Sequence, residues 1–145
     1  MQNSKAVQKV SEIMSRDVHV TNPDKTIEEA ARQMVEGNFG MLPVESQGRL
    51  IGTISDRDIA IRAVAEGRDP DTEVGEIMSK GIVTAMEDDS VTDAAKLMSD
   101  KKIRRLPILN ANKHLVGIVA LGDIAVVNAD VAAAAAALSG ISKPA

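Results

Sequence analysis

The chain has 145 residues, a formal net charge of −4 and no cysteine. This length fits one domain or two small units with a shared core, and the lack of cysteine excludes disulfides, thiolate metal sites and cysteine nucleophiles. The acidic balance favours neither nucleic acid nor an anionic membrane as a partner, and no stretch is typical of a signal peptide or a membrane span. The composition therefore predicts a soluble, cytoplasmic protein.

The chain contains an internal repeat. Segment 10–44 aligns without a gap on segment 74–108, and each copy begins with the same E-I-M-S sequence, at 12–15 and at 76–79. Two copies are too few for a solenoid, so we expect a pseudo-twofold pair that buries a shared face. The predicted organisation is a first repeat at 7–67, a linker at 68–71, a second repeat at 72–128 and a C-terminal extension at 129–145.

Each repeat is predicted to begin with a strand and a capped helix. The short apolar stretches D-V-H-V at 17–20 and G-I-V-T at 81–84 are the expected first strands. Thr26 and Ser90 precede apolar helical stripes and are predicted N-caps, and Gly37 is predicted to end the first helix. The acidic residues that would close the two capping boxes are Glu29 and Asp93.

A hairpin and a second helix complete each repeat. In the first, M-L-P-V is followed by a turn at Gln47 and Gly48 and then by L-I-G-T-I; in the second, L-P-I-L, a turn at 110–113 and L-V-G-I-V follow the same plan. The proline inside each first hairpin strand indicates an edge or a bulged position. A helix from Asp56 to Ala65, stopped by Gly67, would follow in the first repeat. Each repeat is therefore predicted to be an α/β (βαββα) unit.

The sequence G-T-I-S-D-R-D at 52–58 has two compatible interpretations. Ser55 and Asp58 are spaced as a capping box, which local chemistry alone favours. A helix N-terminus also suits a phosphate, in which case Asp58 would accept hydrogen bonds from sugar hydroxyls and Arg57 would add positive charge. The second repeat has G-I-V-A-L-G-D at 117–123, with Ala120 in place of the serine and Gly122 in place of the arginine.

The order E-I-M-S, capped helix, L-P-V or L-P-I, then G-x-x-S-x-x-D-I, occurring twice, resembles the tandem CBS-domain module, named after cystathionine β-synthase. The resemblance covers about residues 7–128. It implies two βαββα units packed as a pair, with up to two clefts for adenosine-type ligands such as AMP, ATP, NAD or S-adenosylmethionine. In that family the aspartate holds the ribose hydroxyls and the serine or threonine helps to bind ribose or phosphate. Site 1, on Ser55 and Asp58, is complete, whereas site 2, on Ala120 and Asp123, lacks the hydroxyl.

The resemblance also places adenine against the first strand and the L-P step of each repeat. Aliphatic strand residues are explained equally well as core, so both interpretations stay open for them. The implied residues are Val18, His19, Val20, Met41, Leu42 and Pro43 for site 1, and Ile82, Val83, Thr84, Arg105, Leu106 and Pro107 for site 2.

The basic segment Lys101–Arg105 is typical of a solvated helix end, where cations suit the negative pole of the helix. Arg104 and Arg105 directly precede the second L-P step, so a phosphate-binding role beside site 2 is the alternative. His19 and His114 are not spaced as metal ligands, and no metal site is expected.

The function predicted from the sequence is a non-catalytic regulatory module that binds an adenosine-type ligand, since no phosphate loop, dinucleotide turn or zinc-protease helix is present. The resemblance implies a homodimer, and the output would act on an effector protein in trans. The alternative is a dimerisation or interaction scaffold with degenerate sites, which the missing hydroxyl at Ala120 favours. The alanine-rich C-terminal extension is predicted to be a helix, either exposed or in a dimer contact.

Overall fold

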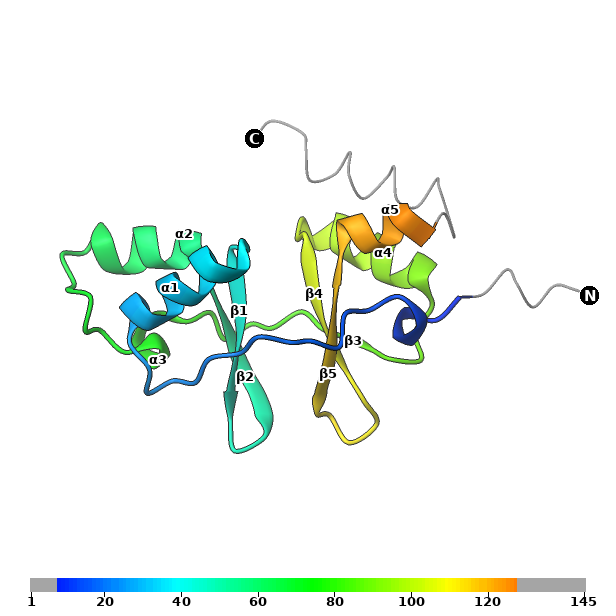
Figure 1. Ribbon diagram of the computed structural model, residues 1–145, viewed down its shortest axis with the longest axis horizontal. Coiled ribbons are helices and arrows are strands. Elements are labelled where there is room, and N and C mark those ends of the chain that lie inside the picture. The colour runs from blue at the N-terminus through cyan, green and yellow to red at the C-terminus, as the bar shows by residue number, and fades with distance from the viewer. Residues whose placement is uncertain (1–7, 128–145) are drawn as a thin grey trace, which may run out of the picture. The chain divides into compact units, whose positions relative to one another are not determined.

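The structure is a computed structural model that describes residues 8–127. Helices alternate with short strands along the chain (Figure 1), which confirms the predicted α/β fold class. The predicted C-terminal helix at 129–145 lies outside the described residues. The elements are η2 (Val10–Glu12), α1 (Ile27–Gly37), β1 (Met41–Ser46), β2 (Arg49–Ser55), α2 (Asp56–Asp58), η3 (Ile59–Val64), α3 (Val74–Ile77), β3 (Ala85–Met86), α4 (Val91–Lys101), β4 (Arg105–Leu109), β5 (Leu115–Ala120) and α5 (Leu121–Val127).

The described chain divides into two compact units. The central unit is His19–Ile82, and the terminal unit consists of the described residues up to Val18 and from Val83 on. The central unit contains the two-stranded sheet β1-β2, and the terminal unit contains the three-stranded sheet β3-β4-β5. Neither unit is a single sequence repeat, because each contains the first segment of the other repeat.

This exchange of first segments extends into both hydrophobic cores. Val10 and Met14, from the first repeat, are buried in the core of the terminal unit, whereas Val74 and Ile77, from the second repeat, are buried in the core of the central unit. The repeat boundaries predicted from the sequence therefore describe the order of the chain and not the units in which it packs.

Each exchanged segment also pairs with the last strand of its host unit. Ser79 and Thr53 exchange two backbone hydrogen bonds, with N···O distances of 2.8 and 2.9 Å. Ser15 and Ile118 exchange two equivalent bonds, both 2.9 Å. The E-I-M-S sequence of one repeat thus extends the sheet that the other repeat forms.

The predicted N-caps of α1 and α4 are confirmed. The Thr26 hydroxyl accepts a hydrogen bond from the Glu29 N–H, and the Glu29 carboxylate accepts one from the Thr26 N–H, which completes a capping box. Ser90 accepts the corresponding bond from the Asp93 N–H.

Gly37 is the last residue of α1, as predicted, but it is not the left-handed residue that usually closes a helix. The left-handed residue is Asn38, with φ of 57°, and asparagine tolerates this region better than most side chains do. Gly37 is required for a different reason, because a Cβ atom there would overlap the ring of Phe39.

The two predicted hairpins are confirmed as antiparallel pairs, β1 with β2 and β4 with β5. Gln47 and Gly48 both have positive φ, 55° and 78°, as a two-residue hairpin turn of the favoured twist requires. A register shift follows each proline, at Val44/Glu45 and at Ile108/Leu109, which agrees with the bulged interpretation. The edge interpretation is wrong for Pro107, since β4 is the middle strand of its sheet.

The first strands lie further along the chain than predicted. Residues 17–20 and 81–84 form no ladder; instead Thr21 makes one bridge to Val44, and β3 begins at Ala85. A segment is a strand only where its backbone pairs with another strand. The bulges next to the two prolines place the backbone hydrogen-bonding groups of β1 and β4 opposite Thr21 and Ala85.

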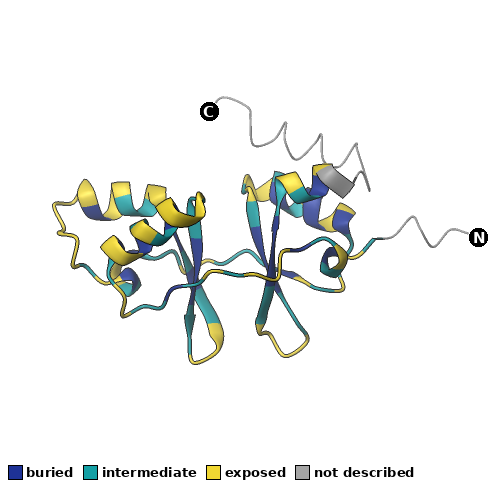
Figure 2. Ribbon diagram, viewed as in Figure 1, coloured by how far each residue is buried: buried dark blue, intermediate teal, exposed yellow. Residues whose placement is uncertain are grey.

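The helix predicted from Asp56 to Ala65 is one turn of α-helix, α2, followed by the π-helix η3. Gly67, with φ of 75°, takes the left-handed conformation beyond it, as predicted. The outer faces of α1, α2 and η3 are exposed, while the strands beneath them are buried or half-buried (Figure 2). No helix within residues 8–127 is long and apolar enough to cross a membrane.

Candidate functional site

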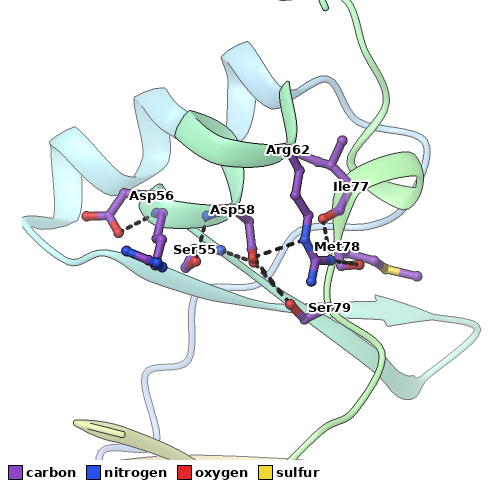
Figure 3. Close-up of polar contacts among 8 residues, drawn as sticks. Ser55, Asp56, Asp58, Arg62, Ile77, Met78 and Ser79 are labelled. Atoms are coloured by element: carbon purple, nitrogen blue, oxygen red, sulfur yellow. Dashed lines mark hydrogen bonds and ion pairs between the residues drawn. The ribbon is translucent and has the colours of Figure 1, made fainter. Parts of the chain in front are cut away.

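The turn from β2 into α2 forms the capping box that the sequence predicts (Figure 3). The Ser55 hydroxyl accepts a hydrogen bond from the Asp58 N–H at 3.0 Å, and Asp58 Oδ2 accepts one from the Ser55 N–H at 2.9 Å. These two bonds fix the direction of the Asp58 side chain, which is only 14% exposed. The capping role is therefore confirmed.

Asp58 also contacts two residues outside the sequence motif, both visible in Figure 3. The Ser79 hydroxyl lies 3.3 Å from Oδ1 and 3.4 Å from Oδ2, and Arg62 Nε lies 3.9 Å from Oδ1. Arg62 reaches across from η3 and donates hydrogen bonds to the carbonyl oxygens of Ile77 and Met78, at 3.3 and 3.2 Å. The site thus combines the end of the first repeat with the start of the second.

The sequence analysis missed Ser79 and Arg62. The signal for Ser79 was its recurrence in the repeat, as Ser15, but nothing in a linear sequence indicates that the two first segments change places. The signal for Arg62 was its spacing of four residues from Asp58, which puts the two side chains on one helical face. Its counterpart in the second repeat is Val127.

Gly52, which begins the motif, has a packing role. A Cβ atom on Gly52 would lie 2.7 Å from the Ser79 carbonyl oxygen and 2.9 Å from Met78 Sδ. The corresponding Gly117 faces Met14, where an added Cβ would overlap the methionine side chain. In both units the lack of a side chain at this glycine therefore leaves space for the methionine of the exchanged E-I-M-S segment.

Arg57 is exposed, and its backbone N–H donates to the Asp56 carboxylate at 2.8 Å. The glycine at position 40 packs close to the same carboxylate, since a Cβ there would lie 2.9 Å from Asp56 Oδ2. Asp56 thus adds a negative charge directly beside Arg57, which was expected to add positive charge at the N-terminus of α2.

The residues assigned to adenine in site 1 fall into separate environments. Met41 is half-buried and pairs with Ser55 across the hairpin, which brings it to the capped turn. Leu42 and Pro43 are buried, Leu42 within the core of the central unit. The Val20 carbonyl accepts a hydrogen bond from the Gln33 side chain. Val18 is assigned to the terminal unit and directly precedes the first residue of the central unit, His19.

His19 is exposed, and its ring centroid lies 5.6 Å from that of Phe39. Phe39 was also missed by the sequence analysis, although it is the single aromatic ring among the Phe, Tyr and Trp residues of the chain and lies two positions before Met41. The planes of the two rings are tilted by 32° to each other.

Site 2 retains half of the capping box. Asp123 Oδ2 accepts a hydrogen bond from the Ala120 N–H at 2.8 Å, but Ala120 has no hydroxyl to return the bond. The Arg104 carbonyl accepts from the Leu121 N–H at 3.1 Å, as the Gly40 carbonyl does from Asp56 in site 1. The turn therefore has the same backbone course with less side-chain support.

The other residues assigned to site 2 are divided between core and surface. Leu106 and Pro107 are buried, and Val83 packs against the core of the terminal unit. Thr84 is half-buried in the same unit. Ile82 belongs to the central unit. Arg105 is half-buried and pairs with Ala120, whereas Arg104 is exposed.

Two hollows lie elsewhere in the central unit. One, of about 300 Å³, lies between α1 and the start of η3 and is lined by Met34, Phe39 and Ile59 among others. The other, of about 630 Å³, lies beside the turn of the hairpin and is lined by Thr21, Glu45 and Gln47 among others. Neither includes Ser55 or Asp58 in its lining. Among residues 8–127, no three His, Cys, Asp or Glu side chains are grouped so that they could hold a metal ion.

The fold and the two capped turns define a tandem α/β module. The CBS domain model matches residues 10–64 and 74–130, and the chain belongs to this family. A CBS domain-containing protein of Bacillus subtilis strain 168, YhcV, is 47% identical over 133 residues, which cover 92% of this chain and 94% of that protein.

Two similar solved structures contain adenosine compounds. The CBS domain pair of protein MJ0100, in complex with 5-methylthioadenosine and S-adenosyl-L-methionine, is 31% identical with a TM-score of 0.74, over 84% of this chain and 96% of that chain. The protein CBSX2, in complex with AMP, is 25% identical with a TM-score of 0.73, over 83% of this chain and 95% of that chain.

Proposed function

We propose that this chain is a non-catalytic regulatory module that binds an adenosine-containing ligand at site 1. The observation that carries the proposal is the Asp58 carboxylate, which is shielded from solvent, fixed in direction by Ser55 and equipped with acceptor positions for the ribose hydroxyls. Similar structures with AMP and with S-adenosylmethionine support this class of ligand. ATP and NAD belong to the same proposed class.

Site 2 is proposed to bind more weakly than site 1. Asp123 keeps a single capping bond, and Ala120 offers no hydroxyl to ribose or phosphate. The two arginines beside the turn, Arg104 and Arg105, would supply phosphate affinity without the serine.

A thermal-shift panel of AMP, ADP, ATP, NAD and S-adenosylmethionine tests the proposal. A ligand at 100 times its Kd adds about 2.7 kcal/mol, which raises the Tm of a chain of this size by roughly 5–10 °C. Asp58→Asn should remove most of this shift, and the matched variant Asp123→Asn should retain it. If no adenosine compound raises the Tm, the proposal fails; if Asp123→Asn is the more damaging variant, the ranking of the two sites is reversed.

The second candidate function is a dimerisation or interaction scaffold in a homodimer. It is favoured by three exposed apolar side chains on α1 and η3, Val35 (80% exposed), Ile61 (47%) and Val64 (68%). Exposed apolar residues on adjacent helices are typical of protein interfaces. In this function the output would again act on an effector protein in trans.

Size-exclusion chromatography with light scattering tests the scaffold. The double variant Val35→Glu, Val64→Glu should convert a dimer to a monomer, while Glu36→Gln, which changes an exposed neighbour on α1, should leave the mass unchanged. A wild type that is monomeric at micromolar concentration excludes the homodimer.

A further inference from the structure

The two oxygens of the Asp58 carboxylate share the Ser79 hydroxyl, which lies 3.3 Å from Oδ1 and 3.4 Å from Oδ2, but they differ in their other partners. Oδ2 accepts the short bond from the Ser55 N–H, 2.9 Å, which belongs to the capped turn itself. Oδ1 has only longer contacts, the Ser79 hydroxyl at 3.3 Å and Arg62 Nε at 3.9 Å. Hydrogen bonds between two oxygens are usually 2.5–3.0 Å, so the bond from Ser79 is weak. Oδ1 is thus the oxygen whose present partner is most easily replaced.

The partner of Oδ1 comes from a segment that leads directly out of the central unit. Ser79 belongs to the exchanged E-I-M-S sequence, and the central unit ends three residues later at Ile82. Besides the burial of Ile77 in the core, the segment is held by three kinds of polar contact: the backbone pair with Thr53, the hydrogen bonds from Arg62 to Ile77 and Met78, and the side-chain bond from Ser79 to Asp58 (Figure 3). Only the last of these uses the carboxylate that a ligand would need.

We propose that Ser79 is a latch on site 1: its hydroxyl occupies Oδ1 of Asp58 in the free protein, and a ligand hydroxyl displaces it. This inference rests on the proposed function, since it assumes that ribose binds to Asp58. Displacement leaves the Ile77–Ser79 segment attached by Arg62, by Thr53 and by the buried Ile77 side chain, but without the side-chain bond of Ser79. Occupancy of the site is thereby converted into looser attachment of the segment that connects the central unit to the rest of the chain.

The effect on ligand affinity distinguishes a latch at Ser79 from a ligand-binding residue at the same position. A ligand that has to displace a hydroxyl binds more tightly once that hydroxyl is removed. Titration calorimetry with AMP should therefore give Ser79→Ala a Kd roughly twofold to fivefold lower than that of wild type, the range expected for a weak hydrogen bond. An unchanged or higher Kd overturns the latch, and a higher one makes Ser79 a ligand contact instead.

The matched control for Ser79 is Ser15→Ala, because Ser15 has the same place in the repeat and the same backbone pair with the last strand of its unit. It should leave the Kd for AMP unchanged. An equal gain in affinity from Ser15→Ala would show that the effect has no connection with Asp58 and would overturn the proposal.

Hydrogen exchange measured by mass spectrometry supplies the second readout. In wild type, AMP should raise exchange in the peptide that covers residues 77–82; in Ser79→Ala, that peptide should already exchange faster without ligand and should change little on adding AMP. Arg62→Gln should raise its exchange further, and Arg32→Gln, which breaks the comparable Arg32–Glu28 ion pair on α1, should not. Slower exchange of this peptide on adding AMP overturns the latch.

The latch and the proposed function can fail separately. If AMP and S-adenosylmethionine both fail to bind wild type, the proposed function fails, and the ligand step of the latch fails with it. Exchange in ligand-free Ser79→Ala then still decides whether the hydroxyl holds the segment. If AMP binds but Ser79→Ala changes neither the Kd nor the exchange, the site stands and the latch fails alone.

Discussion

The turns at 52–58 and 117–123 follow the same backbone course and differ in the side chains that support it. Both begin with a glycine that admits a methionine from an exchanged segment, and both keep an aspartate that caps the following helix. Only the first turn has a serine that returns the capping bond and an arginine that reaches the exchanged segment. The glycine and the aspartate are present in both turns, which indicates that the fold requires them. The serine and the arginines differ between the turns, so the fold tolerates their replacement.

The two glycines offer the strongest test of this comparison. In Gly52→Ala the new methyl group would meet a backbone carbonyl oxygen, that of Ser79, which cannot move without breaking the pair with Thr53. In Gly117→Ala its nearest neighbours would be side-chain atoms of Met14, and the two that overlap it most, Sδ and Cγ, can move by a change of rotamer. We expect a loss of about 2–3 kcal/mol in the free energy of unfolding for Gly52→Ala and about 1 kcal/mol for Gly117→Ala, measured by urea denaturation.

A control for the glycine pair is Gly81→Ala, because an added Cβ there has no atom within 4 Å. Gly81→Ala should leave the free energy of unfolding nearly unchanged. If Gly117→Ala costs as much as Gly52→Ala, the backbone contact is not what distinguishes the two turns.

The serine that distinguishes the turns can be exchanged between them. Ser55→Ala removes the hydroxyl that accepts the Asp58 N–H and should cost about 1 kcal/mol in the free energy of unfolding. Ala120→Ser places a hydroxyl beside the Asp123 N–H and should gain roughly 0.5–1 kcal/mol. Thermal denaturation of both variants measures these changes. A destabilising Ala120→Ser would mean that the second turn lacks the geometry of a capping box.

The smallest expected effect concerns acid stability of the central unit. Hydrogen bonds from the Thr26 N–H and hydroxyl lower the pKa of Glu29, and the hydrogen bond from Arg68 lowers the pKa of Glu76, both relative to the usual 4.5. A carboxyl group with a lowered pKa in the folded state stabilises the fold above its unfolded pKa. This contribution is therefore present above pH 4.5 and is lost as the pH falls through the lowered values.

Denaturation of Glu29→Gln and Glu76→Gln between pH 3 and pH 7 measures that contribution. Each variant should be slightly less stable than wild type near pH 7, and the difference should shrink as the pH falls below about 4.5. Glu36→Gln on α1 is the control, and it should change the stability equally little at every pH. A difference that stays constant with pH would contradict the assigned cause.

The elements with local causes could be predicted from the sequence. Thr26 and Ser90 cap their helices because a hydroxyl and an N–H three residues on meet wherever a helix begins. The hairpin at Gln47 and Gly48 and the pairing of Ser55 with Asp58 have similarly local origins. The family assignment also followed from the sequence, because the order of such local motifs recurs twice.

The features that depend on distant partners could not be predicted in this way. The similarity between the two repeats shows which segments correspond to each other, but it does not show which residues are in contact. The exchange of the E-I-M-S segments therefore could not be recognised in the sequence. The contact between Ser79 and Asp58 and the core positions of Val10 and Val74 follow from that exchange. The contact of Gly37 with the ring of Phe39 was missed although it is local, because spacing in sequence does not show which way the ring turns.

The exchange also determines where the chain can be cut. A fragment designed on the first repeat, residues 10–64, would lose Val74, Ile77 and Ser79 and would carry Val10 and Met14 without the core that buries them. The fragment 19–82 instead contains the core, the hairpin and the full set of contacts around Asp58 in one uninterrupted stretch. For fragment complementation or circular permutation, the natural breakpoints are therefore next to His19 and Ile82, in the middle of what the repeat pattern would present as strands.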